Sequence, residues 1–330
     1  MQLGTVSLEN NLILAPILNV TTAPYRRYCR SFYPIGLVSV PMLNIKGITQ
    51  SPRSIKEELF KIEEERPISV QLIGNDKESL KNSIDFLDSY KFDVLDINAG
   101  CPSKRALKAR SGGYLLKDLK ILKVLLNTAV KYSSKPVSLK TRLGFEDSSS
   151  INELVKIAND SGIEFLIVHA RTVKDRFYDR SLDLDALKEL KEKSVIPVVG
   201  NGDICDPLSA KFFLDYTNVD AIMIGRGTIG NPEIFRQIDE YIRREKFVAF
   251  KNSKEVMKRN IEKYEQLIEN YLENIKLRFS LEDYLFVELK RNSIWLTKNL
   301  ENSTIIREKL SKAKNLAQLK GTLNDYFNNN

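Results

Sequence analysis

Residues 165–169 read Phe-Leu-Ile-Val-His, an apolar run that ends on the only histidine of the chain. A strand with one solvent-exposed face alternates apolar and polar residues, whereas a run that is apolar throughout is typical of a parallel strand buried on both faces. Seven more short runs, rich in branched residues, precede or follow it: 12–15, 36–40, 68–73, 92–97, 137–140, 196–200 and 220–224. Eight parallel strands are the number that closes a (β/α)8 barrel.

Stretches with helical spacing follow most of these runs. Leu80, Ile84 and Leu87 lie after the third run, and 119–125 shows the same spacing after the fourth. An open doubly wound sheet usually carries a GxGxxG fingerprint after its first strand, and none follows 12–15. The fold class that we predict is therefore α/β, a TIM barrel.

The strand signal disappears after about Phe250. Apolar residues then recur at spacings of three and four, which predicts four helices: 256–272, 281–297, 305–312 and 316–326. A barrel takes roughly 250 residues, which leaves room for one accessory domain in this chain. We expect a catalytic barrel at 1–245 and a C-terminal four-helix domain at 246–330.

Composition narrows the class of protein. Of the 330 residues 42% are hydrophobic and 28% charged, as in ordinary globular proteins. No run approaches the roughly 20 apolar residues that span a bilayer, and residues 1–15 lack the features of a secretory signal, so we expect a cytoplasmic protein without a membrane partner. Cys29, Cys101 and Cys205 are too widely spaced for a disulfide framework or a metal site. The formal charge of +8 favours a polyanionic partner without proving one, because many metabolic enzymes are equally basic.

Barrel enzymes place their active sites at the carboxyl ends of the strands. The residues at or just after the predicted strand ends are unusually polar: Pro16, Gln71, Asn98 with Cys101, Lys140 with Arg142, His169 with Arg171, Asn201 with Asp203, and Arg226.

The last two strands end in glycine-containing loops. Their sequences are Gly-Asn-Gly-Asp at 200–203 and Gly-Arg-Gly at 225–227. Glycines let backbone N–H groups approach an anion closely, and this is the usual phosphate site of such barrels. The alternative is that the glycines only form tight turns, but an arginine beside two adjacent loops favours a phosphorylated cofactor.

His169 and Lys140 end neighbouring strands. A single histidine near apolar residues is ordinarily a core residue, and a lysine can simply pair with a nearby carboxylate. A lysine that ends a buried strand is nevertheless costly without an anionic or electron-rich partner, and a reduced flavin ring would supply one.

Cys101 lies in a turn that follows the fourth strand. Inert packing is the ordinary role of a free cysteine, but the next residues carry four cations and no acid, which favours an exposed loop: Lys104, Arg105, Lys108 and Arg110. A protonated thiol can act as a general acid, whereas nearby cations favour the thiolate nucleophile, so charge alone leaves both roles open.

Together these motifs resemble the tRNA-dihydrouridine synthases. The most specific stretch is 96–118, with Asn-Ala-Gly-Cys-Pro at 98–102 and Ser-Gly-Gly at 111–113. Other matching motifs follow in the family's order: 15–26, 70–74, 140–144, 168–172, 200–204 and 225–227.

The resemblance implies FMN as the cofactor, reduced by NADPH or NADH, and tRNA as the partner. Hydride would pass from the reduced FMN to C6 of a uracil extruded from the RNA, while Cys101 protonates C5 from the other face. Asn98, Arg142 and Tyr178 would orient the base. The implied FMN-binding residues are Pro16, Ile17, Leu18, Gln71, Lys140, His169, Asn201, Gly202, Asp203, Gly225 and Arg226. No metal is implied, we expect a monomer, and the helical domain would hold the tRNA body.

The chain departs from the family pattern at Ile17, where Met is usual, and at Thr22, where Asp is usual. These departures leave the target uridine open. Two other functions remain as alternatives: an FMN barrel that reduces a free pyrimidine, similar to dihydroorotate dehydrogenase, and a tRNA-binding chaperone with vestigial flavin chemistry. Intact Cys101, Lys140 and His169 argue against the chaperone.

Overall fold

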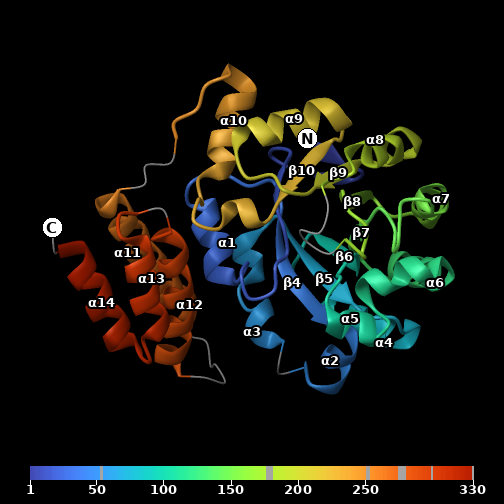
Figure 1. Ribbon diagram of the computed structural model, residues 1–330. Coiled ribbons are helices and arrows are strands. Elements are labelled where there is room, and N and C mark those ends of the chain that lie inside the picture. The colour runs from blue at the N-terminus through green and yellow to red at the C-terminus, as the bar shows by residue number, and fades with distance from the viewer. Residues whose placement is uncertain (53–54, 176–180, 250–252, 274–279, 299, 329–330) are drawn as a thin grey trace.

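The computed structural model describes residues 1–52, 55–175, 181–249, 253–273, 280–298 and 300–328 (Figure 1). Its main sheet has eight parallel strands in the order β3-β10-β9-β8-β7-β6-β5-β4. The strands are β3 (Leu12–Leu14), β4 (Val38–Asn44), β5 (Ile68–Ile73), β6 (Val94–Ala99), β7 (Val137–Arg142), β8 (Phe165–His169), β9 (Val198–Asn201) and β10 (Ala221–Ile224). The first and last strands of this order meet where Leu14 N–H donates to the Leu37 carbonyl at 2.9 Å and Gly36 N–H donates to the Leu12 carbonyl at 3.0 Å. All eight predicted strands are present, and the predicted barrel is confirmed.

Alternate residues of each strand face opposite sides of the barrel wall. Phe165, Ile167 and Val199 belong to a small apolar cluster inside the barrel, whereas Leu166 and Val168 pack in the larger cluster with the surrounding helices. Both faces are therefore apolar, which explains the unbroken hydrophobicity of residues 165–168.

Ten helices of the described chain accompany the barrel: α1 (Ala23–Arg30), α2 (Ile45–Gln50), α3 (Lys56–Leu59), α4 (Lys77–Leu87), α5 (Lys104–Lys108), α6 (Leu119–Tyr132), α7 (Ile151–Ser161), α8 (Leu184–Lys193), α9 (Pro207–Thr217) and α10 (Ile234–Arg244). Helix α4 begins after Asp76, whose side chain caps it by accepting from Ser79 N–H at 2.8 Å. Its predicted apolar face, Leu80, Ile84 and Leu87, is buried. None of the described helices is long and apolar enough to cross a membrane.

The amino terminus forms a short hairpin that was not predicted, made of β1 (Gln2–Leu3) and β2 (Val6–Ser7). Leu3 and Val6 join the apolar cluster inside the barrel. Thr5 N–H donates to the Glu164 carboxylate at 2.8 Å, just before β8 begins. The hairpin therefore covers the end of the barrel opposite the strand ends that carry the polar residues. Each of its strands has only two residues, too few for a periodic signal.

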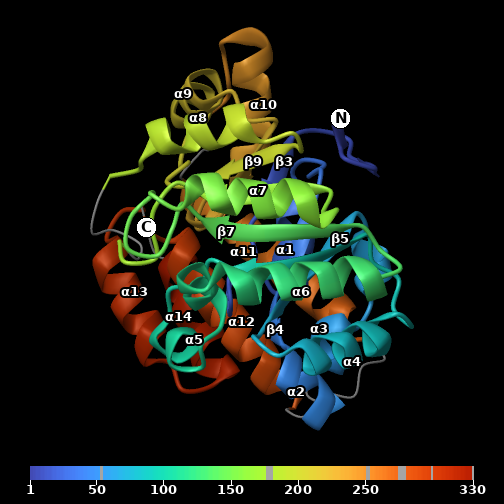
Figure 2. The ribbon, with the colours of Figure 1, turned by 90° about the vertical axis from the view of Figure 1, so that its right-hand side faces the viewer.

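The four predicted C-terminal helices are α11 (Lys254–Leu272), α12 (Leu281–Leu296), α13 (Ser303–Lys312) and α14 (Leu316–Asn328). They form a bundle that lies against the α1 side of the barrel (Figures 1 and 2). Tyr264 of α11 makes edge-on contacts with Tyr25 and Tyr28 of α1, with ring centroids 6.5 and 5.1 Å apart. Aromatic rings bury much apolar area at this interface, so the bundle is an integral part of the fold.

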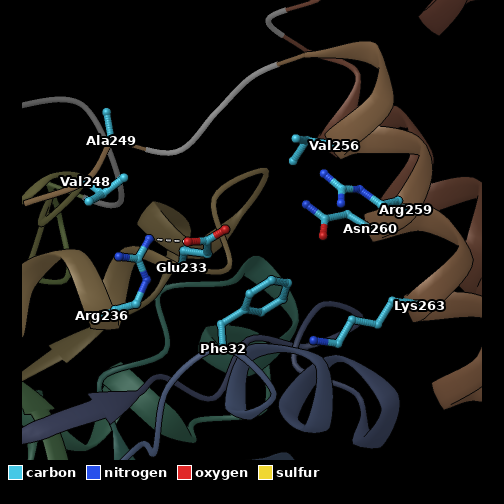
Figure 3. A pocket seen from close by; sticks show the side chains of 9 residues that line it. All are labelled: Phe32, Glu233, Arg236, Val248, Ala249, Val256, Arg259, Asn260 and Lys263. Carbon is cyan, nitrogen blue, oxygen red and sulfur yellow. Dashed lines mark hydrogen bonds and ion pairs between the residues drawn. The ribbon is translucent and has the colours of Figure 1, made fainter.

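A cavity of about 390 Å³ lies between α10 and α11 (Figure 3). Arg259, Asn260 and Lys263 project from α11 on one side, and Glu233 and Arg236 face them from the α10 side. None of the residues predicted to bind flavin lines this cavity. The predicted active site is therefore a different part of the surface.

Candidate active site

The strand register brings the predicted polar residues together at the carboxyl end of the barrel. Asn98 of β6 is paired with Lys140 of β7, and Arg142 of β7 is paired with His169 of β8. His169 is in turn paired with Asn201 of β9. These residues thus occupy adjacent strands at similar heights, although they lie far apart in the sequence.

Lys140 is half-buried in this group. Its Nζ donates to Asn201 Oδ1 at 3.2 Å, and Asn201 Nδ2 donates to the Met223 carbonyl at 2.7 Å. Burial lowers the pKa of the lysine, and the nearby Asp96 carboxylate opposes that shift. Among the described residues Lys140 forms no ion pair within 4.0 Å, so the simple lysine–carboxylate pair is not what holds it.

His169 is held as a neutral ring. Burial lowers its pKa well below the usual range, and the cations Arg142 and Lys140 lower it further. Its Nδ1 is buried and has no hydrogen-bond partner among the described residues. Buried polar atoms almost always have a partner, so an orphaned atom at a strand end indicates a bound group that completes the site.

The two glycine loops lie beside each other because β9 and β10 are neighbours. Gly202 has a φ of +142°, a backbone conformation that favours glycine. A Cβ at Gly225 would lie 3.2 Å from Ile17 Cδ1, so this glycine keeps the loop close to the segment after β3. Pro16 and Ile17 of that segment are half-buried, whereas Leu18 is exposed.

Arg226 and Arg171 share one carboxylate. Arg226 Nη2 lies 2.6 Å from Asp203 Oδ1, and Arg171 Nη2 lies 2.5 Å from Asp203 Oδ2. Burial raises the pKa of Asp203, but the two arginines outweigh it and hold the pKa below its usual value. Asp203 therefore orients both guanidinium groups at the predicted phosphate loops.

Cys101 is half-buried at the start of the loop after β6, and its Sγ lies 3.4 Å from Ser103 Oγ. Asn98 Oδ1 accepts from Cys101 N–H at 3.0 Å, and Arg142 Nε donates to the Gly100 carbonyl at 3.0 Å. This loop, residues 100–103, is the cysteine loop, and side chains of two neighbouring strands hold it. The four basic residues that follow are exposed, as expected, but three of them lie in the short helix α5 and only Arg110 comes after it.

Gly112 and Gly113 explain the Ser-Gly-Gly motif. A Cβ at Gly112, which has a φ of +59°, would come within 2.9 Å of Cys101 Cβ. A Cβ at Gly113 would come within 2.7 Å of Val173 Cγ2, and its N–H donates to the Cys101 carbonyl at 3.0 Å. Both glycines let the chain pack directly on the cysteine loop.

Three further residues at this site escaped the sequence analysis. Asp96 and Ser138 lie in one row with Gln71 across the barrel wall, and Met42 Sδ lies 3.8 Å from Asn98 Nδ2. A carboxylate between the apolar residues Leu95 and Ile97 was the available signal for Asp96. Tyr178, predicted to orient the base, lies outside the described residues. No group of three or more His, Cys, Asp or Glu side chains in the described ranges is arranged to hold a metal ion.

The residues present fit a phosphorylated flavin. Lys140 offers a cation to an electron-rich ring, His169 Nδ1 lacks a partner, and the glycine loops beside Arg226 suit a phosphate. A group of this kind would supply a partner for His169 Nδ1.

Solved structures with the same fold include morphinone reductase and the histamine dehydrogenase of Rhizobium sp. 4-9. The first aligns with a TM-score of 0.55 at 14% identity over 72% of this chain and 89% of that chain. The second aligns with a TM-score of 0.57 at 12% identity over 73% of this chain and 47% of that chain. Identities this low support the barrel fold alone.

Curated relatives are closer in sequence. The chain is 35% identical to tRNA-dihydrouridine synthase B of Pasteurella multocida over 75% of this chain and 74% of the relative. It is 34% identical to tRNA-dihydrouridine synthase B of Escherichia coli over 73% and 75%. A probable tRNA-dihydrouridine synthase of Rickettsia conorii is 30% identical over 93% and 90%.

Fold, site and relatives together define a flavin-dependent oxidoreductase built on a (β/α)8 barrel. The family model described as "Dihydrouridine synthase (Dus)" matches residues 13–330, which include the C-terminal helices. The chain belongs to the dihydrouridine synthase family.

Proposed function

We propose that this chain is a tRNA-dihydrouridine synthase in which Cys101 donates a proton to C5 of a uracil ring. The observation that carries the proposal is the position of its thiol: Cys101 is half-buried and held by Asn98 and Arg142 next to the strand ends of Lys140 and His169. When bound, FMN supplies the hydride that adds to C6, after reduction by NADPH or NADH. The proton and the hydride together saturate the C5–C6 double bond.

The chain's own residues divide the remaining work. Asn98 and Arg142 hold the cysteine loop and, in this proposal, orient the uracil beside it. Lys140 contributes positive charge beside the flavin ring, where burial strengthens its effect. The residues that surround the cofactor in this proposal lie at or near the strand ends: segment 16–18, Gln71, His169, Asn201, Gly202, Asp203, Gly225 and Arg226. A folded tRNA hides its uracils, so the base must leave its stack to reach Cys101.

The cofactor proposal makes the first prediction. The purified protein should be yellow and should release FMN on denaturation, because the glycine loops provide a phosphate site. Chromatography of the supernatant identifies the flavin and its stoichiometry. A colourless protein that also fails to bind added FMN would contradict the enzymatic function.

Substrate size separates this proposal from the alternative barrel reductase of a free pyrimidine. We propose that residues 1–245 form the catalytic barrel, that 246–330 bind the tRNA body, and that the protein acts as a cytoplasmic monomer. The aromatic contacts of Tyr264 with α1 mean that deletion of the helical domain would expose an apolar face. Charge variants of the full chain are therefore the better test of tRNA binding.

The cations of the helical domain differ in how far they are engaged in contacts within the protein. Lys290 Nζ donates to the Ala313 carbonyl at 2.7 Å, and Arg291 lies 2.9 Å from Glu288, so both serve internal contacts. Arg259 is exposed, and Lys258 beside it is half-buried, with its Nζ donating to the Oδ1 of the exposed Asn328 at 3.3 Å. Lys251, Lys276 and Arg278 lie outside the described residues.

The second prediction follows from these positions. Lys258→Ala with Arg259→Ala should weaken tRNA binding about tenfold and reduce its salt dependence, because phosphate contacts release counterions. Filter binding over a series of salt concentrations measures both. The matched control is Lys120→Ala with Lys123→Ala on the exposed face of α6. Unchanged binding by the first pair, together with loss on neutralising Lys104, Arg105, Lys108 and Arg110, would assign recognition to these basic residues after Cys101.

A further inference from the structure

A chain of hydrogen bonds crosses β7, β6 and β5 beneath the cysteine loop. Ser138 Oγ donates to Asp96 Oδ1 at 2.6 Å, and Gln71 Nε2 donates to Asp96 Oδ2 at 2.7 Å. Gln71 Oε1 accepts from Asn98 Nδ2 at 2.9 Å. Asn98 Oδ1 then accepts from the backbone N–H groups of Gly100 and Cys101 at 3.1 and 3.0 Å. The chain thus connects a carboxylate in the barrel wall to the backbone of the cysteine.

The strand register produces this chain. Gln71 is paired with Asp96, and Asp96 is paired with Ser138, so three side chains of adjacent strands lie in one row. Asp96 and Gln71 are only 2% and 1% exposed. Water is therefore not available to replace a lost partner, and each broken bond leaves a buried polar group unsatisfied.

The two ends of the hydrogen-bond chain fix the direction in which its bonds run. An ionised carboxylate only accepts hydrogen bonds, and a backbone N–H only donates. Between them, the amides of Gln71 and Asn98 satisfy every contact in a single orientation: each turns its nitrogen toward Asp96 and its oxygen toward Cys101. Reversing either amide would place two donors or two acceptors face to face in a buried site.

We propose that Asp96 is a positioning residue that acts through Gln71 and Asn98 to fix the backbone at Gly100 and Cys101, and with it the direction of the Cys101 thiol. The inference rests on the proposed function only where it gives the thiol a role as proton donor. The hydrogen-bond chain itself is a property of the folded protein. It also explains why a carboxylate is buried where it touches neither the cysteine nor its loop.

Three variants test the polarity of the chain. Asp96→Leu removes the acceptor and leaves the Gln71 amide without a partner. Gln71→Glu sets two carboxylates face to face once both are ionised, so exchange is compared at alkaline pH, where no shared proton restores the bond. The double variant Asp96→Asn with Gln71→Glu exchanges acid and amide. The new amide at 96 then donates to the new carboxylate at 71, which still accepts from Asn98, and all contacts are restored with unchanged net charge.

Hydrogen exchange of the Gly100 and Cys101 amides in the purified flavoprotein measures the outcome without tRNA or reductant. Both single variants should accelerate this exchange about tenfold, because the bonds to Asn98 Oδ1 loosen. The exchanged double variant should return it to the wild-type rate. Exchange in the β8 segment, residues 165–169, serves as the internal control for overall stability.

Unchanged exchange at Gly100 and Cys101 in the single variants would overturn the proposal, as would a double variant no better protected than Gln71→Glu. Acceleration in the β8 segment by the same factor would also overturn it, because the effect would then be general destabilisation. The proposed function is tested separately by dihydrouridine formation. A wild-type protein that fails to reduce tRNA would contradict the function, while the exchange pattern would still decide the role of Asp96.

Discussion

Cys101→Ala should lower dihydrouridine formation at least about 100-fold, the usual contribution of a general acid. The thiol is the proposed proton source for C5, whereas the predicted cofactor contacts lie on other strands. The variant should therefore retain flavin and still oxidise NADPH. Single-turnover reduction of tRNA by the pre-reduced protein isolates the step.

The matched control is Cys205→Ala. Cys205 is exposed in the loop after β9, and its Sγ lies 3.5 Å from Asp206 Oδ2. This variant should reduce tRNA at the wild-type rate. Undiminished turnover by Cys101→Ala would remove the cysteine from the mechanism and would leave its position unexplained.

Glu65→Ala should destabilise the fold by about 3–5 kcal/mol, because it leaves a charged guanidinium buried without its partner. Arg26 Nη2 lies 2.5 Å from Glu65 Oε2, and the two side chains are 0% and 1% exposed. Arg26 Nη1 also donates to the Thr21 carbonyl at 2.9 Å, which ties α1 to the segment after β3. Urea unfolding measures the loss of stability.

The adjacent residue provides the control. Glu64 pairs with Arg27 at the surface, with half of its side chain exposed, so Glu64→Ala should cost no more than about 1 kcal/mol. Arg26→Met with Glu65→Leu removes both buried charges and should recover most of the stability. Equal losses for Glu65→Ala and Glu64→Ala would show that the buried pair does not stabilise the fold.

Much of the barrel was predictable because its strands are defined locally. The strand at 165–169 is buried on both faces, and the unbroken apolar sequence of 165–168 shows this directly. Boundaries were less certain: the second strand was predicted at 36–40 and is Val38–Asn44, because Pro41 interrupts the run and the pairing with β5 shifts register between Val40 and Leu43. The hairpin at the amino terminus was missed because strands of two residues leave no pattern.

The site was predictable only as a set of strand-end residues. Motif order and the position of Cys101 pointed to the carboxyl-end face of the barrel, since parallel strands all end there. Contacts between residues far apart in sequence left no local signal. One such contact is the hydrogen bond of 2.8 Å that the Thr22 hydroxyl donates to the Glu288 carboxylate. Thr22, where the family usually has Asp, therefore contacts the helical domain. The role of Asp96 likewise depends on strand register.

The central claim is that this chain reduces uridine within tRNA. The most direct measurement incubates the purified flavoprotein and NADPH with tRNA that lacks dihydrouridine, then determines the nucleoside masses after digestion. We expect a uridine product heavier by two hydrogen atoms, formed at the full rate only when NADPH and intact Cys101 are both present. Oxidation of NADPH with no change in tRNA mass, together with reduction of a free pyrimidine, would contradict it.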